Sequence, residues 1–144
     1  MNNYVTMNVY EIINKISTAK TKQEKVKLLK EHESWALKDL LRCIYDDTIQ
    51  FLLPGGTPPY TPHNIAASPA PNSFNRLHKN LTYYVKGGQA EKIKSYKREK
   101  MFIDMLESVH PDESVLLVDM MNKKPVKGIT KKLVEEAYPN LIKK

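Results

Sequence analysis

Apolar residues recur along the chain with the three- and four-residue spacing of amphipathic helices, in blocks separated by polar turns. The first block predicts a helix over about residues 8–16 and consists of Val9, Ile12, Ile13 and Ile16. Thr21 and Glu24 have the spacing of a capping box, which predicts that a second helix begins after Thr21. Ser34 is the expected cap of a third helix, whose inward face consists of Leu37, Leu40, Leu41 and Ile44.

Helical spacing resumes in the second half of the chain. Ser73 can cap a fourth helix that stops at Gly87-Gly88, because glycine favours the left-handed conformation at a helix end. A long fifth helix is expected from about Gln89, and its predicted apolar face consists of Ile93, Tyr96, Phe102, Met105, Leu106 and Val109.

Two further helices are expected near the C-terminal end. Pro111 ends the fifth helix and stands near the start of a sixth, for which Asp112 or Ser114 is the expected cap. The predicted apolar residues of the sixth helix are Val115, Leu116, Val118 and Met121. Thr130 should cap a last helix that Tyr138-Pro139 stops, with an inward face of Leu133, Val134 and Ala137.

Residues 54–72 interrupt the helical pattern with six prolines and two glycines. Proline lacks an N–H donor and disfavours helical backbone before it, so this segment is expected to be an irregular crossover loop, packed by Tyr60 and Ile65. The sequence therefore predicts one compact all-α domain over residues 1–144. It should contain six to seven helices, the Pro-rich crossover at 54–72 and a flexible N-terminus at 1–7.

The composition also indicates the cellular compartment of the protein. A chain of 144 residues can bury a single core without disulfides or structural metal ions. The only cysteine, Cys43, excludes an intrachain disulfide and stands in an apolar helical run, so it is expected to be a small core residue. The first ten residues do not resemble a signal peptide, and no apolar run approaches the roughly 20 residues that span a bilayer. We therefore expect a cytoplasmic protein with no membrane partner.

The charge of the chain favours an anionic partner. The formal net charge is +7, and most of it falls between residues 76 and 100, where only Glu91 and Glu99 are acidic. The basic residues of this run are Arg76, Lys79, Lys86, Lys92, Lys94, Lys97, Arg98 and Lys100. A second basic group surrounds Gly128 and consists of Lys123, Lys124, Lys127, Lys131 and Lys132.

Both basic groups adjoin a glycine at an expected helix start. A helix N-terminus offers unpaired N–H groups to a phosphate, and glycine lets the phosphate approach the backbone closely. This arrangement predicts two phosphate clamps, one formed by Gly87, Gly88, Gln89 and Ala90 with Lys86, Lys92 and Lys97, the other by Gly128, Ile129 and Thr130 with Lys127 and Lys131. The alternative interpretation is that the glycines are ordinary helix caps and the lysines form a solvated face.

Signals of catalysis are missing from the sequence. The four histidines are far apart and form no ligand pair at helical spacing, and no Gly-rich phosphate loop of the Walker kind occurs. The adjacent acidic pairs, Asp46-Asp47 and Asp112-Glu113, are more typical of helix ends than of two-metal sites. We expect no enzymatic activity, no cofactor, no metal and no small-molecule substrate.

Three segments carry a resemblance to a known family: EIINKISTAKTKQEKVKLLKEH, LTYYVKGGQAEKI and DESVLLVDMMNKKPVKGITKKLVEEAYPNLI. Their order and spacing resemble the N-terminal helical DNA-binding domain of the ATP-dependent DNA ligases of T-even-type phages. The likeness extends from about Val9 to Ile142. It implies an all-helical domain that packs on the minor-groove face of a duplex and contacts mainly the sugar-phosphate backbone. By this resemblance the two clamp segments, at Gly87–Ala90 and Gly128–Thr130, would meet phosphates.

The sequence also departs from that family. A ligase carries a Lys-x-Asp-Gly adenylation motif, which does not occur here, so this chain is not expected to ligate DNA by itself. Pro125 stands in an insertion before Gly128, which puts the geometry of the second clamp in question. The Pro-rich crossover also looks longer than in the family.

Three functional hypotheses remain open. The first is a non-catalytic accessory protein of a phage, acting in the cytoplasm of the infected host and binding duplex DNA with little sequence preference through Lys86, Lys92, Lys97, Lys127 and Lys131. The second is an adaptor that docks to replication or transcription proteins. The third is a structural protein of the virion that reuses the fold. Salt-sensitive DNA binding, nuclease-resistant protein partners and self-association, respectively, would distinguish them.

Overall fold

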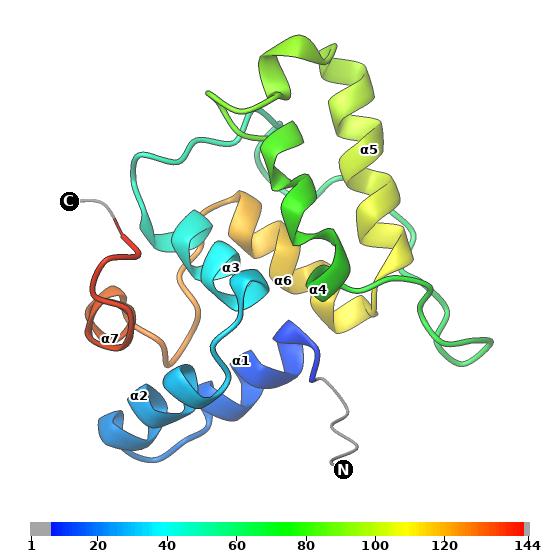
Figure 1. Cartoon of the computed structure of the whole chain (residues 1–144). Coiled ribbons are helices and arrows are strands. Elements are labelled where there is room, and N and C mark those ends of the chain that lie inside the picture. The colour runs from blue at the N-terminus through cyan, green and yellow to red at the C-terminus, as the bar shows by residue number, and fades with distance from the viewer. Residues whose placement is uncertain (1–6, 143–144) are drawn as a thin grey trace.

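A computed structural model describes residues 7–142 of the chain. The expected flexible segment at 1–7 lies, except for Met7, outside the described residues. The α-helices of the described part are α1 (Val9–Ser17), α2 (Lys22–Glu31), α3 (Trp35–Tyr45), α4 (Phe74–Leu77), α5 (Ser95–Ser108), α6 (Pro111–Met121) and α7 (Lys131–Ala137). Two short 3₁₀ segments complete them, η1 (His78–Tyr83) and η2 (Ala90–Lys92). The predicted all-α single domain is confirmed (Figure 1).

Helix starts follow the capping residues of the sequence at three places. The hydroxyls of Thr21, Ser34 and Thr130 each accept a hydrogen bond of 3.1 Å from the backbone N–H three residues later. Each bond satisfies a donor that a helix start otherwise leaves unpaired. The predicted starts of α2, α3 and α7 are therefore confirmed.

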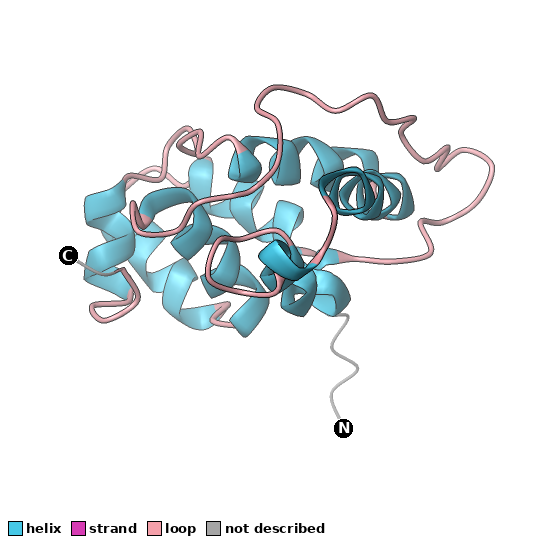
Figure 2. Ribbon diagram, turned by 90° about the horizontal axis from the view of Figure 1, so that it is seen from above, coloured by secondary structure: helices cyan, strands magenta, loops and turns pink. Residues whose placement is uncertain are grey.

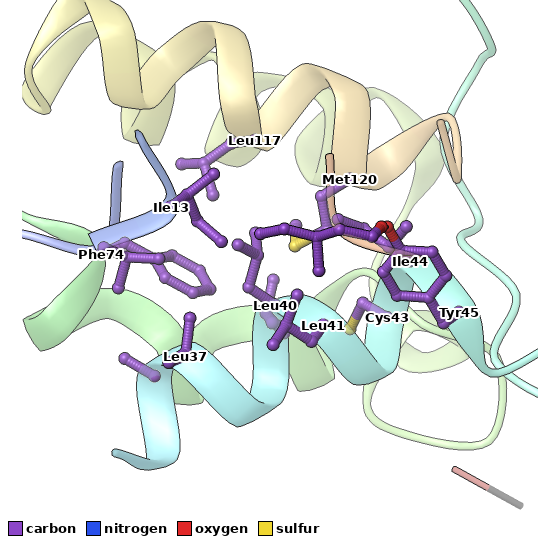
Figure 3. Close-up of a cluster of buried hydrophobic side chains, with 14 of the residues drawn as sticks. Ile13, Leu37, Leu40, Leu41, Cys43, Ile44, Tyr45, Phe74, Leu117 and Met120 are labelled. Carbon is purple, nitrogen blue, oxygen red and sulfur yellow. The ribbon is translucent and has the colours of Figure 1, made fainter. Parts of the chain in front are cut away.

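Helix α3 runs through the middle of the core. Its inward residues Leu37, Leu40 and Leu41 are fully buried, and Figure 3 shows them facing Leu117 and Met120 of α6. Ile13 of α1 and Phe74 of α4 close the same cluster. Burial of a leucine side chain stabilises the fold by about 1.5–3 kcal/mol, so this helix is a main source of stability.

The last helix packs against an early one. Helix α7 lies against α2, and the hydroxyl of the buried Tyr138 donates to the carbonyl of Leu29 in α2. The hydroxyl of Tyr45 in α3 donates to the carbonyl of Ile129 and accepts from the N–H of Val126 at 3.0 Å. Two tyrosine hydroxyls thus attach the segment around α7 to the first three helices.

A buried carboxylate joins three helix starts. Glu113, only 1% exposed, lies in the first turn of α6 and accepts from the N–H of Phe74 at 2.6 Å and of Tyr10 at 3.3 Å. These donors belong to the first turns of α4 and α1. Burial raises the pKa of Glu113, and the two backbone hydrogen bonds partly oppose this rise. The same contact replaces the expected cap at Ser73, whose side chain makes no capping bond.

The fourth helix is much shorter than expected. Helix α4 ends at Leu77, and the chain continues as the 3₁₀ segment η1 to Tyr83. The next residues pair with the segment just before the crossover: the N–H of Leu52 donates to the carbonyl of Tyr84 at 2.7 Å, and the N–H of Lys86 donates to the carbonyl of Gln50 at 2.9 Å. These bonds form an antiparallel bridge between Phe51 and Val85. The pairing of Val85 with Phe51 therefore interrupts the helical backbone before Gly87 and Gly88, where the helix was predicted to stop.

The sixth helix differs from its prediction in its cap and in part of its buried face. The side chain of His110, rather than Asp112 or Ser114, caps α6 by accepting from the N–H of Asp112 at 3.0 Å. Pro111 occupies the first helical position, as expected. Val118 and Met121 are buried as predicted, but Val115 is 56% exposed, and Leu117 and Met120 complete the buried apolar face.

The Pro-rich crossover lies along the outside of the helices, as Figure 2 shows. Gly56 and Asn122 exchange two hydrogen bonds, of 2.8 and 2.9 Å, and the N–H of Thr61 donates to the carboxylate of Glu107 at 2.7 Å. Tyr60 packs against the core as expected. Ile65 does not, because the loop beyond Thr61 turns away and leaves its side chain 47% exposed.

Candidate nucleic-acid interface

The first predicted clamp, at Gly87–Ala90, does not present its backbone to a ligand. The N–H of Gly87 donates to both carboxylate oxygens of Glu91, at 3.0 and 3.3 Å. The N–H of Gly88 donates to the Val85 carbonyl, and that of Gln89 to the Thr82 carbonyl at 2.8 Å. Because Ala90 is fully buried and these donors have internal acceptors, the predicted clamp geometry is wrong.

Close packing, rather than contact with a ligand, explains why glycine occupies position 88. A Cβ atom at Gly88 would lie 2.6 Å from the carbonyl oxygen of Thr82, a distance that backbone atoms cannot accommodate. Gly87 has a φ of +87°, in the left-handed region that glycine adopts most easily. The pair therefore forms a tight turn after the bridge at Val85.

The long helix begins at Ser95, six residues later than expected, and Arg98 accounts for the difference. Its guanidinium donates to the carbonyls of Leu52 at 3.1 Å and Ala90 at 2.9 Å, and to the carbonyl of Ile93. Those contacts hold residues 90–93 in a 3₁₀ turn followed by extended backbone. Arg98 therefore stabilises the scaffold, and Tyr96, expected in the core, is 70% exposed.

The second predicted clamp is also shaped by packing. Gly128 has a φ of +85°, and a Cβ atom there would lie 2.9 Å from the carbonyl oxygen of Ser17. Its own carbonyl accepts from the ammonium of Lys25 at 2.7 Å. Ile129 is buried, and Thr130 caps α7, whose first residue Lys131 is exposed. The glycine permits the chain just before α7 to pass close to the end of α1.

The two clamp segments are not brought together. In Figure 1 the link between α4 and α5 lies at the top of the molecule, whereas the link between α6 and α7 lies low on the left. Lys127 lines a groove of about 560 Å³ between α1 and α6, where the charges of Asp112 and Asp119 balance those of Lys124 and Lys127. The second segment is therefore less cationic than its sequence indicates.

Some lysines of the basic groups bind other groups of the protein itself. The ammonium of Lys123 donates to the carbonyls of Cys43, Asp46 and Ile49 at 2.6–3.0 Å, at the end of α3. Burial lowers the pKa of Lys123. Lys100 lies 3.2 Å from the carboxylate of Asp104. By contrast, across residues 7–142 no ion pair engages the exposed Lys79, Lys86, Lys92, Lys94 or Lys97.

A cationic groove lies between α3 and the glycine turn. It has a volume of about 480 Å³, and Arg42, Lys79 and Lys86 contribute its basic side chains. Gly87 and Gly88 form one wall, and Asp39, the acidic residue of the lining, bonds to His78 at 2.6 Å. Arg42 lies 4.0 Å from the carboxylate of Asp46, so Lys79 and Lys86 supply the positive charge of the groove that no ion pair engages within residues 7–142.

Only part of this groove is predictable from the sequence. Lys86, Gly87 and Gly88 were predicted site residues, and Lys79 belongs to the basic run. Arg42 was missed, because it stands in an amphipathic helix far away in the sequence, and only the packing of α3 against η1 brings it here. Lys92 and Lys97 lie exposed in η2 and α5, beyond the groove lining.

The groove lacks obvious groups for covalent chemistry. Cys43 contributes to its lining but is buried, and burial raises the pKa of its thiol to about 12. Such a thiol is protonated at neutral pH and reacts poorly as a nucleophile. Within residues 7–142 no group of three or more His, Cys, Asp or Glu side chains is placed to hold a metal ion. None of the helices described has the length and apolar character needed to cross a membrane.

Fold and groove together define a small, basic, all-α domain. The model of a family of unknown function, DUF6433, matches residues 12–127, and the chain belongs to this family. The matched span includes the cationic groove and the basic run but ends before α7. No curated protein matches the chain. Its function must therefore be inferred from its own residues.

Proposed function

We propose that the protein is a non-catalytic accessory factor that binds duplex DNA through the sugar-phosphate backbone. The observation that carries the proposal is the cationic groove, with Lys79 and Lys86 exposed and without ion pairs in the described part of the chain. Exposed Lys92, Lys94 and Lys97 extend the positive charge beyond it. The net charge of +7 and the resemblance to phage ligase N-terminal domains support the same function, in a phage replication or repair setting.

Side chains, rather than backbone N–H groups, would make the contacts. Lysine and arginine neutralise phosphates and release condensed counterions, which favours binding at low salt. Phosphate contacts fix position but carry no sequence information, so sequence preference should be weak. Lys127 and Lys131 belong to the other end of the molecule and should contribute less than Lys86.

The test is fluorescence anisotropy with an intact and a nicked duplex across a salt series. Lys79→Met and Lys86→Met should each weaken binding to every sequence alike and lower the slope of log K against log salt by about one. Lys15→Met is the matched control, because Lys15 is exposed on α1, outside the groove. Absence of binding at low salt, or an affinity independent of salt, would reject the proposal.

A docking role is the second candidate. The observation that favours it is a small cavity of about 190 Å³ beneath the Pro-rich crossover, lined by Leu53, Pro58, Phe102, Ile103 and Met121 among others. Such a cavity could take one apolar side chain of a replication or transcription protein. Affinity capture with and without nuclease separates the two functions. Partners that all disappear with the nucleic acid would exclude docking.

A further inference from the structure

Tyr96 is an exposed aromatic side chain within the basic run. It stands at the second position of α5, and 70% of its surface is exposed. Lys94 and Lys97 flank it in sequence and are exposed as well, and Lys92 precedes them in η2. No ring contact or hydrogen bond of the Tyr96 side chain is found within residues 7–142. Its ring is therefore available to a ligand.

Within residues 7–142, the other strongly exposed aromatic residue differs in its surroundings. Trp35 is 72% exposed, but the ammonium of Lys38 lies 5.0 Å from the centre of its ring. A cation over an aromatic face is attracted to it and occupies that face. Tyr96 has no such internal partner, although three lysines surround it in sequence.

Phosphate contacts account for the lysines but not for the aromatic ring. A base offers a flat π-face that stacks on tyrosine, and every base can do so, which makes the contact independent of sequence. In an intact duplex the base faces are already stacked on one another. An aromatic platform beside backbone-binding lysines therefore suits a strand with an unpaired base.

We propose that Tyr96 is a stacking platform for an unpaired base, and that the preferred ligand is a duplex interrupted by a short single-stranded gap. This inference rests on the proposed DNA-binding function and specifies its substrate. Lys94 and Lys97 bind the phosphates on either side of the stacked base. Cationic groove residues Lys79 and Lys86 bind the adjoining duplex.

The experiment compares the full chain on a continuous duplex and on the same duplex with a short gap that carries a fluorescent base analogue. Tyr96→Ala should lower the affinity for the gapped DNA about tenfold and abolish quenching of the analogue, with the affinity for the continuous duplex unchanged. Tyr96→Phe should retain binding and quenching. Trp35→Ala is the matched control and should behave as wild type on both ligands.

The outcomes separate the two proposals. If neither DNA binds at low salt, the DNA-binding function and the stacking role both fail. If both DNAs bind and Tyr96→Ala changes neither, or weakens both equally, only the stacking role is overturned. Circular dichroism of each variant checks that it remains folded, which the exposure of Tyr96 leads us to expect.

Discussion

Arg98 offers the sharpest test of the distinction between a structural and a ligand-binding cation. Its guanidinium donates to three backbone carbonyls, those of Leu52, Ala90 and Ile93. In Arg98→Met the apolar stem is largely kept, but all three acceptors lose a charged donor. Each hydrogen bond to a charged group contributes about 1.5–3 kcal/mol. Because the site is only partly buried, water can bind the freed carbonyls and offset part of this loss. We expect the free energy of unfolding to fall by about 2–4 kcal/mol.

Urea unfolding followed by far-ultraviolet circular dichroism measures this loss, which corresponds to a fall in Tm of about 6–12 °C. Lys97→Met is the matched control, because Lys97 is the exposed neighbour without an ion pair in the described chain, and it should change stability by less than about 0.5 kcal/mol. Arg98→Lys should restore little, since one ammonium cannot reproduce the planar fork. An Arg98→Met variant within about 0.5 kcal/mol of wild type would refute the assigned role.

Three further predictions concern stability and reactivity. Gly128→Ala should destabilise the fold by about 2 kcal/mol more than Gly87→Ala, since both have positive φ but only Gly128 approaches Ser17; equal losses in urea unfolding would contradict this. Because burial raises the pKa of Glu113, its contribution to stability is fully present below its ordinary pKa of about 4.3 and is lost as pH rises through the folded value. The stability of wild type relative to Glu113→Gln should therefore decline as the pH rises above the ordinary pKa of about 4.3, and a constant difference would exclude this linkage. Cys43, with a pKa of about 12, should react with iodoacetamide at least about 100-fold more slowly in the native than in the urea-unfolded protein, and comparable rates would show that the thiol is accessible.

The sequence predicts helices well where local chemistry decides them. Thr21, Ser34 and Thr130 cap helices as their side chains indicate, and the four inward residues of α3 are buried as their spacing indicates. These signals act within one or two turns of the chain. Because no distant partner competes with them, a local pattern is sufficient.

The predictions fail where distant segments determine the backbone. Pairing of Val85 with Phe51 ends the 3₁₀ segment early, and Arg98 binds the carbonyl of Leu52 across the crossover. Neither contact leaves a periodic signal in the sequence. Consequently the basic run was correctly seen as a concentration of charge, but its glycines were wrongly assigned to the start of a helix.

The candidate site was predictable in composition rather than in geometry. Lys86 could be found from the density of positive charge, whereas Arg42 enters the groove only through the packing of α3 against η1. Tyr96 was misplaced because its spacing fits the apolar face of a helix that begins too early. The rest of the predicted face is correct, because Phe102, Met105, Leu106 and Val109 are buried, so the error is confined to the first turn of α5, where it concealed the exposed aromatic ring.

The contact between Tyr138 and Leu29 has a consequence for biosynthesis. The two residues are 109 positions apart, and the hydroxyl of one bonds to the backbone of the other where α7 packs on α2. A ribosome adds about 5–20 residues each second, so α2 emerges several seconds before the helix that covers it. During this interval Leu29 is exposed to solvent and to chaperones. The native N-terminal half should therefore become protected from proteolysis only after synthesis has passed Tyr138.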